Sequence, residues 1–286
     1  MKPMLNGKRL SIAIPASVVS DTPHLREKTS KIGLIGRAAA IFKINQIIIY
    51  PDLEIRIQER EIALTSKLLN YMETPQYLRK TLFKIDPQLQ YAGILPPLRT
   101  PHHPLCQGGS LRVGEYREAV ALSHTTEGTL VEVGLSRSGI IVGQRIPVGK
   151  RVTTRVKKTD GKVELELADR NEIRDYWGYT VTEWRGTLGR LFQNREFDLQ
   201  LATSRYGLPF IDVIDQVRER WEKSNSVLMA FGAPARGLKG ILEREGLCLE
   251  KVVEFVVNTL PNQGTETVRT EEAVLASLAA FNIFSL

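Results

Sequence analysis

The chain has 286 residues, of which 42% are hydrophobic and 25% are charged. These values exclude fibrous and wholly disordered classes of protein. The formal net charge of +7 favours an anionic partner, and no apolar run approaches the ~18 residues of a membrane-spanning helix, so we expect no membrane partner.

The first segment resembles a signal peptide only in outline. Lys2, Lys8 and Arg9 precede an apolar stretch at 10–19, but Pro15 interrupts that stretch and a helical pattern follows at once. We therefore expect a buried strand there instead of a cleaved leader, and a cytoplasmic protein.

Strands and helices alternate over the first 83 residues. Ser20 or Asp21 can cap a helix that runs to Phe42. Three isoleucines in a row are typical of a buried parallel strand. The further elements expected here are the strand Gln46–Tyr50 and the helices Ile55–Tyr71 and Gln76–Phe83. This order predicts an α/β domain with a parallel sheet.

Gly33 and Gly36 do not form a dinucleotide-binding fingerprint. They lie inside the first helix, whereas the fingerprint needs glycines at the turn after the first strand, and residues 16–21 contain none. We expect both glycines to permit close helix packing.

The pattern changes after residue 91. Prolines crowd residues 96–104, which indicates a domain boundary. Short alternating segments separated by turns then predict a small β-barrel or sandwich. The expected strands are Glu118–Leu122, Gly128–Val133, Gly139–Val142, Arg151–Val156 and Lys162–Leu167. We expect residues 98–174 to be an insertion into one α/β domain made of residues 1–97 and 175–286.

The insertion carries one dense basic cluster, which suits phosphate groups because each neutralised phosphate releases a counterion. Its members are Lys150, Arg151, Arg155, Lys157, Lys158 and Lys162. The alternative is a solvated hairpin whose cations face water. Aromatic residues that could stack on bases, or be buried, follow at Tyr176, Trp177, Tyr179 and Trp184.

No metal site is expected. His102, His103 and Cys106 lie close in sequence, but no second cluster accompanies them, and Cys248 is far away.

Helices and strands alternate again in the last third. The expected strands are Leu199–Thr203, Ser226–Ala230 and Val252–Val257, and the expected helices are Pro209–Lys223, Gly237–Arg244 and Thr270–Phe281. Each strand is followed by a glycine-containing loop, at 204–207, 231–238 and 258–267. Open α/β sheets bind ligands at the carboxyl ends of their strands, so the three loops predict one ligand site.

Several segments resemble the SPOUT family of RNA methyltransferases. Lys31-Ile-Gly33-Leu-Ile-Gly-Arg37 resembles the first motif of the SpoU-type members, with Lys31 in the place of Asn. The loop 231–238 resembles the second motif, with Pro234 in the place of Glu. Leu260-Pro261-x-x-Gly264 resembles the third.

Downstream of the third motif, Arg269 and Glu271 stand where those relatives carry Asn and Ser. The segments 71–79 and 258–272 are similar to the archaeal and eukaryotic branch of the superfamily that has an inserted OB-like domain. The resemblance covers nearly the whole chain.

The resemblance implies a fold and an assembly. The fold would be a SPOUT-type parallel sheet with a C-terminal trefoil knot at about 200–286, interrupted by an OB-like barrel. Members are homodimers in which each active site lies close to the partner subunit. Apolar residues of the last helix would pack at that interface or in the core: Val274, Leu275, Leu278 and Phe281.

The resemblance also implies an activity: methyl transfer from S-adenosylmethionine to a base nitrogen or ribose hydroxyl of RNA, with ribosomal RNA as the expected substrate and S-adenosylhomocysteine as the product. Residues implied to bind the cofactor are Thr203, Ser204, Phe231, Gly232, Ala233, Pro234, Gly237, Leu238, Asn258, Thr259, Leu260, Pro261, Asn262, Gln263, Gly264, Thr265 and Thr267. RNA-binding candidates are Lys150, Arg151, Arg155, Lys157 and Lys158. The alternative is a non-catalytic RNA-binding or ribosome-assembly protein that keeps the fold.

Arg37 inherits a catalytic role from the resemblance, in which it holds a phosphate or the target nucleotide. The alternative is an ion pair at the surface or in the dimer. Glu266, Glu271 or Glu272 could accept a proton from a base nitrogen. Glu271 and Glu272 equally suit the first turn of a helix, where the helix dipole favours acidic side chains.

Overall fold

The computed structural model describes residues 7–104, 111–194 and 196–285. The chain divides into two compact units. The sheet unit consists of residues 7–72, 88–97 and 179–286, and the barrel unit contains residues 73–87 and 98–178. The expected domain boundaries stay a prediction, and residues 73–87 group with the barrel. Among the described residues, no helix is long and apolar enough to span a membrane.

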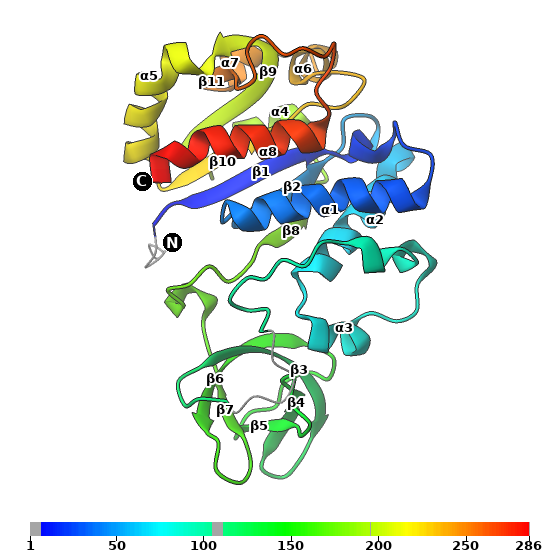
Figure 1. Cartoon of the computed structure of the whole chain (residues 1–286), viewed down its shortest axis with the longest axis vertical. Coiled ribbons are helices and arrows are strands. Elements are labelled where there is room, and N and C mark those ends of the chain that lie inside the picture. The colour runs from blue at the N-terminus through cyan, green and yellow to red at the C-terminus, as the bar shows by residue number, and fades with distance from the viewer. Residues whose placement is uncertain (1–6, 105–110, 195, 286) are drawn as a thin grey trace. The chain divides into compact units, whose positions relative to one another are not determined.

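The sheet unit is built on six parallel strands in the order β11-β9-β10-β1-β2-β8 (Figure 1). Their bounds are β1 Arg9–Pro15, β2 Gln46–Tyr50, β8 Thr180–Glu183, β9 Leu199–Pro209, β10 Ser226–Ala230 and β11 Phe255–Asn258. The inner strands are apolar on both faces, and Ile12, Ile14, Ile47 and Ile49 are all 0% exposed. A parallel sheet buried on both faces requires such runs, so the predicted α/β class is confirmed.

Helices cover both faces of this sheet. Helices α1, α5 and α8 pack on one face, and α4, α6 and α7 pack on the other. The helix bounds are α1 Leu25–Ile41, α2 Ile55–Glu73, α3 Gln76–Leu82, α4 Leu188–Gln193, α5 Phe210–Lys223, α6 Leu238–Arg244, α7 Leu249–Val252 and α8 Thr270–Phe281. Short 3₁₀ turns lie at 16–19, 87–89, 92–94, 170–172 and 282–285.

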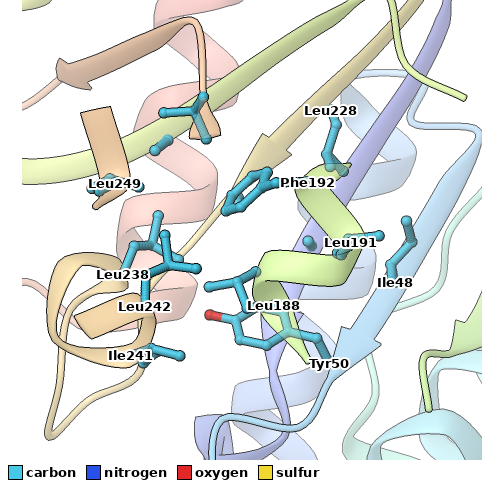
Figure 2. Close-up of a cluster of buried hydrophobic side chains, with 14 of the residues drawn as sticks. Ile48, Tyr50, Leu188, Leu191, Phe192, Leu228, Leu238, Ile241, Leu242 and Leu249 are labelled. Atoms are coloured by element: carbon cyan, nitrogen blue, oxygen red, sulfur yellow. The ribbon is translucent and has the colours of Figure 1, made fainter. Parts of the chain in front are cut away.

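One buried cluster fixes the start of a predicted ligand loop. Figure 2 shows Leu188, Leu191 and Phe192 of α4 lying among side chains of β2 and of α6. In the same cluster, the hydroxyl of Tyr50 donates a hydrogen bond of 2.6 Å to the carbonyl oxygen of Phe231. The end of β10 is therefore held by both packing and a buried hydrogen bond.

The chain departs from expectation at the first turn. Strand β1 ends at Pro15, and α1 begins at Leu25, so the helix cap predicted at Ser20 or Asp21 is wrong. Asp21 instead accepts a hydrogen bond of 2.7 Å from Lys31 Nζ. A long-range ion pair has replaced the local cap.

The expectation of close packing at Gly33 and Gly36 is confirmed. A Cβ atom at Gly33 would lie 2.9 Å from Pro96 Cδ. A Cβ atom at Gly36 would lie 2.9 Å from the Tyr179 hydroxyl and 3.0 Å from Met72 Sδ. Only glycine leaves room for these neighbours.

The barrel unit contains a closed barrel of five strands in the order β3-β4-β5-β7-β6. Their bounds are β3 Tyr116–His124, β4 Gly128–Glu132, β5 Gly139–Val142, β6 Arg151–Lys158 and β7 Glu164–Leu167. The pair β5–β7 is parallel and the other pairs are antiparallel. All five predicted strands are confirmed, and inward-facing side chains such as Ala119, Val131 and Val156 form the core.

Candidate functional site

A cavity of about 270 Å³ lies between the second part of β9 and the loops that follow β10 and β11. The first predicted loop, 204–207, is wrong, because these residues belong to β9, which runs to Pro209. The loops are far apart in sequence, yet each contributes to its wall. Predicted residues that line it are Thr203, Ser204, Phe231, Gly232, Ala233, Pro234, Gly237, Asn258, Thr259, Leu260, Gln263 and Thr267. The structure thus brings most of the predicted cofactor-binding residues into one hollow.

Other predicted residues do not line the cavity. Leu238 is 1% exposed and packs in the cluster drawn in Figure 2. Residues Pro261, Asn262, Gly264 and Thr265 are exposed and belong to the turn beyond the wall.

Sequence reasoning missed a further set of lining residues: Arg205, Tyr206, Ala235, Arg236, Val268, Thr270, Ala273 and Ser277. The first four lie within the segments 204–207 and 231–238, whose glycines predicted the site, so the same glycines could have indicated them. Ala273 and Ser277 are four residues apart on α8, a spacing that places them on one helix face. Nothing in the sequence indicated that this face meets the loops.

Side-chain hydrogen bonds tie the walls together. Thr203 Oγ1 donates to Ala230 O at 3.0 Å, and Thr270 Oγ1 donates to Gly232 O at 3.1 Å. The hydroxyls of Thr259 and Ser277 lie 2.7 Å apart. Each bond joins two different elements, so the wall is held in place before any ligand arrives.

Asn258 organises the third loop. Its Oδ1 accepts a hydrogen bond of 3.0 Å from Leu260 N, and its Nδ2 donates one of 3.0 Å to Arg205 O. Further along, Gln263 Nε2 donates to Thr265 O at 2.8 Å. The third loop is therefore shaped by its own amides and joined to the second part of β9.

Two glycines allow close backbone approach at the cavity. A Cβ atom at Gly232 would lie 3.0 Å from Gly237 Cα. A Cβ atom at Gly207 would lie 2.7 Å from the carbonyl oxygen of Val256, a backbone atom that cannot swing away. Glycine is needed at both positions for the loop after β10 and the end of β9 to keep this shape.

The lining is mixed in chemistry. Hydroxyls, amides and backbone groups lie beside Phe231, Leu260 and Val268, and the charged lining residues are Arg205 and Arg236. None of the described lining residues is acidic. The volume is close to the ~300 Å³ at which small-molecule sites begin. Such a hollow suits a nucleoside-sized ligand.

An ion cluster centred on a buried lysine lies beside the cavity. Lys31 is 6% exposed, and its Nζ lies 2.7 Å from Asp21 Oδ1 and 3.5 Å from Glu271 Oε2. Burial alone would raise the pKa of Asp21, but the hydrogen bond and charge of Lys31 hold it below its ordinary value. Burial raises the pKa of Glu271 despite the same lysine. Glu271 follows Thr270 in sequence but does not itself line the cavity.

The other two candidate proton acceptors are placed differently. Glu272 Oε2 accepts a hydrogen bond of 2.9 Å from Arg269 N at the start of α8, so the helix N-terminal role is confirmed for this residue. Glu266 is exposed, and its backbone carbonyl accepts from Arg205 and Gln263.

Arg37 lies away from the cavity of its own chain. Its Nη1 donates a hydrogen bond of 2.9 Å to Pro97 O, and it is not a lining residue. Within one chain it therefore does not reach a ligand in the hollow.

The predicted basic cluster on and next to β6 divides into one mostly buried cation and several exposed ones. Arg151 is mostly buried and lies 2.5 Å from both Glu73 Oε2 and Glu118 Oε2. Lys150, Arg155, Lys157 and Lys158 are exposed. Strand β7 places acidic partners beside two of them, since Lys157 Nζ lies 3.2 Å from Glu166 and Lys158 Nζ 3.7 Å from Glu164. The exposed cations are thus partly neutralised.

The aromatic residues considered for base stacking are largely engaged within the protein. Tyr179 is 1% exposed and donates to Leu69 O, so burial is confirmed for it. Trp177 Nε1 donates to Glu118 Oε1 at 2.7 Å. Trp184 Nε1 donates to Thr187 O at 2.9 Å and packs on the cluster of Figure 2. Tyr176 is half-buried.

The two histidines both contact the backbone carbonyl oxygen of one glutamate. Nε2 of His102 and of His103 lie 3.0 Å and 2.7 Å from the carbonyl oxygen of Glu73. Cys106 lies outside the described residues. Among the described residues, no group of three His, Cys, Asp or Glu is arranged to hold a metal ion.

Comparison with known proteins gives one family and several relatives. A family model described as "Putative RNA methyltransferase" matches residues 9–281. An uncharacterized protein of Halobacterium salinarum is 33% identical over 294 aligned residues, covering 96% of this chain and 98% of that protein. The 28S rRNA (uridine-N(3))-methyltransferase of Homo sapiens is 31% identical over 307 residues, covering 95% of this chain and 77% of that protein.

The protein of the same name in Drosophila melanogaster is 32% identical over 312 residues, covering 96% of this chain and 62% of that protein. The similarity therefore extends over both units of the chain.

Proposed function

We propose that the chain methylates a base nitrogen of ribosomal RNA with S-adenosylmethionine as donor. The chain belongs to the RNA methyltransferase family whose model it matches, and it is an RNA methyltransferase. The observation that carries the proposal is the similarity to two 28S rRNA (uridine-N(3))-methyltransferases over 95% or more of this chain. Their names favour a base nitrogen of uridine over a ribose hydroxyl as the acceptor.

The cavity supports this donor. Its lining offers hydroxyl and amide groups for an adenosine, from Thr203, Asn258 and Gln263, and apolar surface from Leu260. When bound, S-adenosylmethionine supplies a methyl group that its sulfonium already activates. The chain's own part is then to bind the two reactants and hold them in line, which by itself lowers the barrier by removing the cost of bringing them together.

Proton handling follows from the same lining. A base nitrogen that accepts a methyl group gives up its proton, and no carboxylate is found among the described lining residues. We propose that the proton passes to solvent at the open side of the cavity. The main contribution of the chain is then to orient the nucleobase, and not to supply a strongly basic side chain that accepts the proton.

The barrel is proposed to be an OB-like domain that holds RNA. Its five strands and the parallel pair β5–β7 support this topology. Exposed Lys150, Arg155, Lys157 and Lys158 provide positive charge on or next to one strand. Arg155 lies 5.9 Å from the ring of Tyr116, which joins a cation to an aromatic side chain, as single-stranded RNA sites commonly do.

A knotted C-terminus and a homodimer remain proposals. In support of a tightly threaded segment at about 200–286, the pairing of β9 with β11 shifts register at Val256, and Gly207 lies close against the Val256 backbone there. For the dimer, α1 and α8 pack together and leave Leu34 52% and Leu275 47% exposed. In such a dimer, Arg37 would act at the partner's cavity, where we propose that it holds a phosphate of the RNA.

The proposal is tested first by calorimetry with S-adenosylmethionine. We expect wild-type protein to bind, and Gly232→Val to lose affinity because its side chain would meet Gly237 at 3.0 Å or less. Lys239→Ala, an exposed position on α6 outside the cavity lining, is the matched control.

Mass mapping of ribosomal RNA in a strain that lacks the gene then tests the reaction. We expect one methylated base to disappear and to return with the wild-type gene, but not with Gly232→Val. An unchanged modification profile would instead support a non-catalytic RNA-binding or assembly protein.

A further inference from the structure

An exposed aromatic ring stands at the cavity. Tyr206 is 78% exposed and is one of the cavity's lining residues, beside Arg205. A tyrosine ring normally gains free energy by burial, so a ring that folding leaves in water beside a binding cavity has an unused apolar surface.

The ring is held in place despite its exposure. The guanidinium carbon of Arg205 lies 4.7 Å from the ring centroid, over the ring. Arg205 Nη2 donates to the Tyr206 hydroxyl at 2.6 Å, and Nη1 donates to Glu266 O at 2.7 Å. One arginine therefore ties the ring to the loop that follows β11.

The backbone below the ring is equally constrained. Tyr206 N donates to Ser204 Oγ at 3.2 Å, and the next residue, Gly207, is in close contact with the backbone of Val256. A side chain that is already ordered loses little conformational entropy when a ligand stacks on it. The arrangement is a preorganised flat surface.

Positive charge beside the Tyr206 ring favours a nucleotide as the ligand. Arg205 and Arg236 are the charged residues among the described lining, and both are exposed. Single-stranded RNA is commonly held by aromatic and arginine planes that stack on bases, with cations near the phosphates. An apolar protein segment would gain nothing from two arginines at this rim.

We propose that Tyr206, held by Arg205, is the stacking platform for the target nucleobase, a pyrimidine extruded from the RNA strand. This inference rests on the proposed function, because it names the residue that positions the substrate of that reaction. A base on this ring lies at the edge of the hollow proposed for the methyl donor, which is where the acceptor is needed.

Photo-cross-linking tests the platform without any need for activity. The probe is a short single-stranded RNA that carries 5-iodouridine, irradiated with the full-length protein and mapped by peptide mass spectrometry. We expect the adduct on Tyr206. Adducts confined to the barrel or to other surfaces would overturn the proposal.

Kinetics with Tyr206 variants provide the second readout. For Tyr206→Ala we expect kcat/KM for ribosomal RNA from the gene-deletion strain to fall about 10- to 100-fold, as loss of one base stack implies. Tyr206→Phe, which keeps the ring, should stay within about 5-fold of wild type. The affinity for S-adenosylmethionine and the elution volume of both variants should match wild type.

Each contrary result is informative. Unchanged kcat/KM in Tyr206→Ala overturns the platform, as does an equal loss of S-adenosylmethionine affinity, which would make the ring part of the donor site. A change in oligomeric state would instead assign the ring to a protein interface. If wild-type protein methylates no RNA yet cross-links at Tyr206, the proposed function fails while the platform stands.

Discussion

Lys31 and Glu271 are two of the charged residues that the resemblance to the SpoU-type motifs sets against Asn and Ser, and the structure places them 3.5 Å apart. Both are 6% exposed. Taken one at a time, each departure looks like the loss of a functional residue. Together they form one buried ion pair, and exposed Asp21 is a second partner of Lys31. The two departures are therefore physically coupled.

A double-mutant cycle tests this coupling. Glu271→Ser alone removes one partner of a buried charge, and Lys31→Asn leaves buried Glu271 and exposed Asp21 without their shared cation. We expect Lys31→Asn to lower the free energy of unfolding by about 3 kcal/mol. The double variant should be more stable than the sum of the single effects by about 1 kcal/mol or more, measured by urea unfolding. Strict additivity would contradict the coupling.

Glu73 makes the stability of the barrel unit depend on pH. Burial alone would raise its pKa, but Arg151 and His102 lower it to about 2. A carboxyl group whose pKa is lower in the folded state contributes stability above the unfolded pKa, about 4.5, and loses it as the pH falls towards about 2. We expect the free energy of unfolding to decline over that window.

The matched variants are Arg151→Met and Lys157→Met. Arg151→Met leaves Glu73 and Glu118 buried without their main cation, so we expect a loss of about 3–5 kcal/mol at neutral pH and a flatter acid limb below about pH 4. Lys157→Met removes an exposed cation 3.2 Å from Glu166 and should change stability by less than about 1 kcal/mol. Equal effects of the two variants would contradict the assigned network.

Helix α1 packs closely against its neighbours at Gly36. Its sequence predicted close packing at Gly36 but not the neighbours, which are Met72 at the end of α2 and Tyr179 just before β8. Tyr179 is buried and its hydroxyl donates to Leu69 O at 3.1 Å, so it cannot swing out without breaking that hydrogen bond.

Gly36→Val should therefore destabilise the sheet unit by about 1–3 kcal/mol, because a larger side chain overpacks this position. Gly93→Ala is the control, since a Cβ atom there would have no neighbour within 4 Å. Thermal unfolding followed by circular dichroism measures both. A Gly36→Val protein as stable as wild type would show that α1 can shift away from Tyr179.

Elements differ in how strongly their sequence specifies them. Strands β2 and β10 and helix α8 have the bounds that their apolar pattern predicted. Strand β8 and helices α4 and α7 went unpredicted, because they have only 4, 6 and 4 residues. Strand β9 runs to Pro209, six residues beyond the prediction, because its second part pairs with β11 after a register shift. Pairing between distant strands has no local signal.

At the scale of the whole molecule, the proposed dimer makes a sharp prediction. We expect wild-type protein to sediment as a dimer, and Leu34→Asp combined with Leu275→Asp to sediment as a monomer, because a buried unpaired carboxylate opposes association. Ile57→Asp on α2, where the side chain is 68% exposed, is the control and should stay dimeric. A monomeric wild-type protein would contradict the proposed assembly.

RNA binding by the whole chain has its own signature. Replacing Arg155, Lys157 and Lys158 by Ala should weaken binding of single-stranded RNA. It should also reduce the slope of log affinity against log salt by up to about 0.7 for each phosphate that the variant no longer neutralises. Lys239→Ala, at an exposed position on α6 outside the basic cluster, is the control. An unchanged slope would place the RNA elsewhere.

The sequence by itself determined the class of fold, the order of most elements and the glycine loops after β10 and β11, because apolar periodicity and turn residues act over a few neighbouring positions. It also indicated the barrel strands by the same local rules. Tertiary structure decided which residues meet. Folding brought Thr203, Gly232 and Asn258 around one cavity, withdrew Arg151 into a buried network and kept Arg37 outside the hollow. Such outcomes depend on interactions between segments distant in sequence, and only the packed chain sets those interactions.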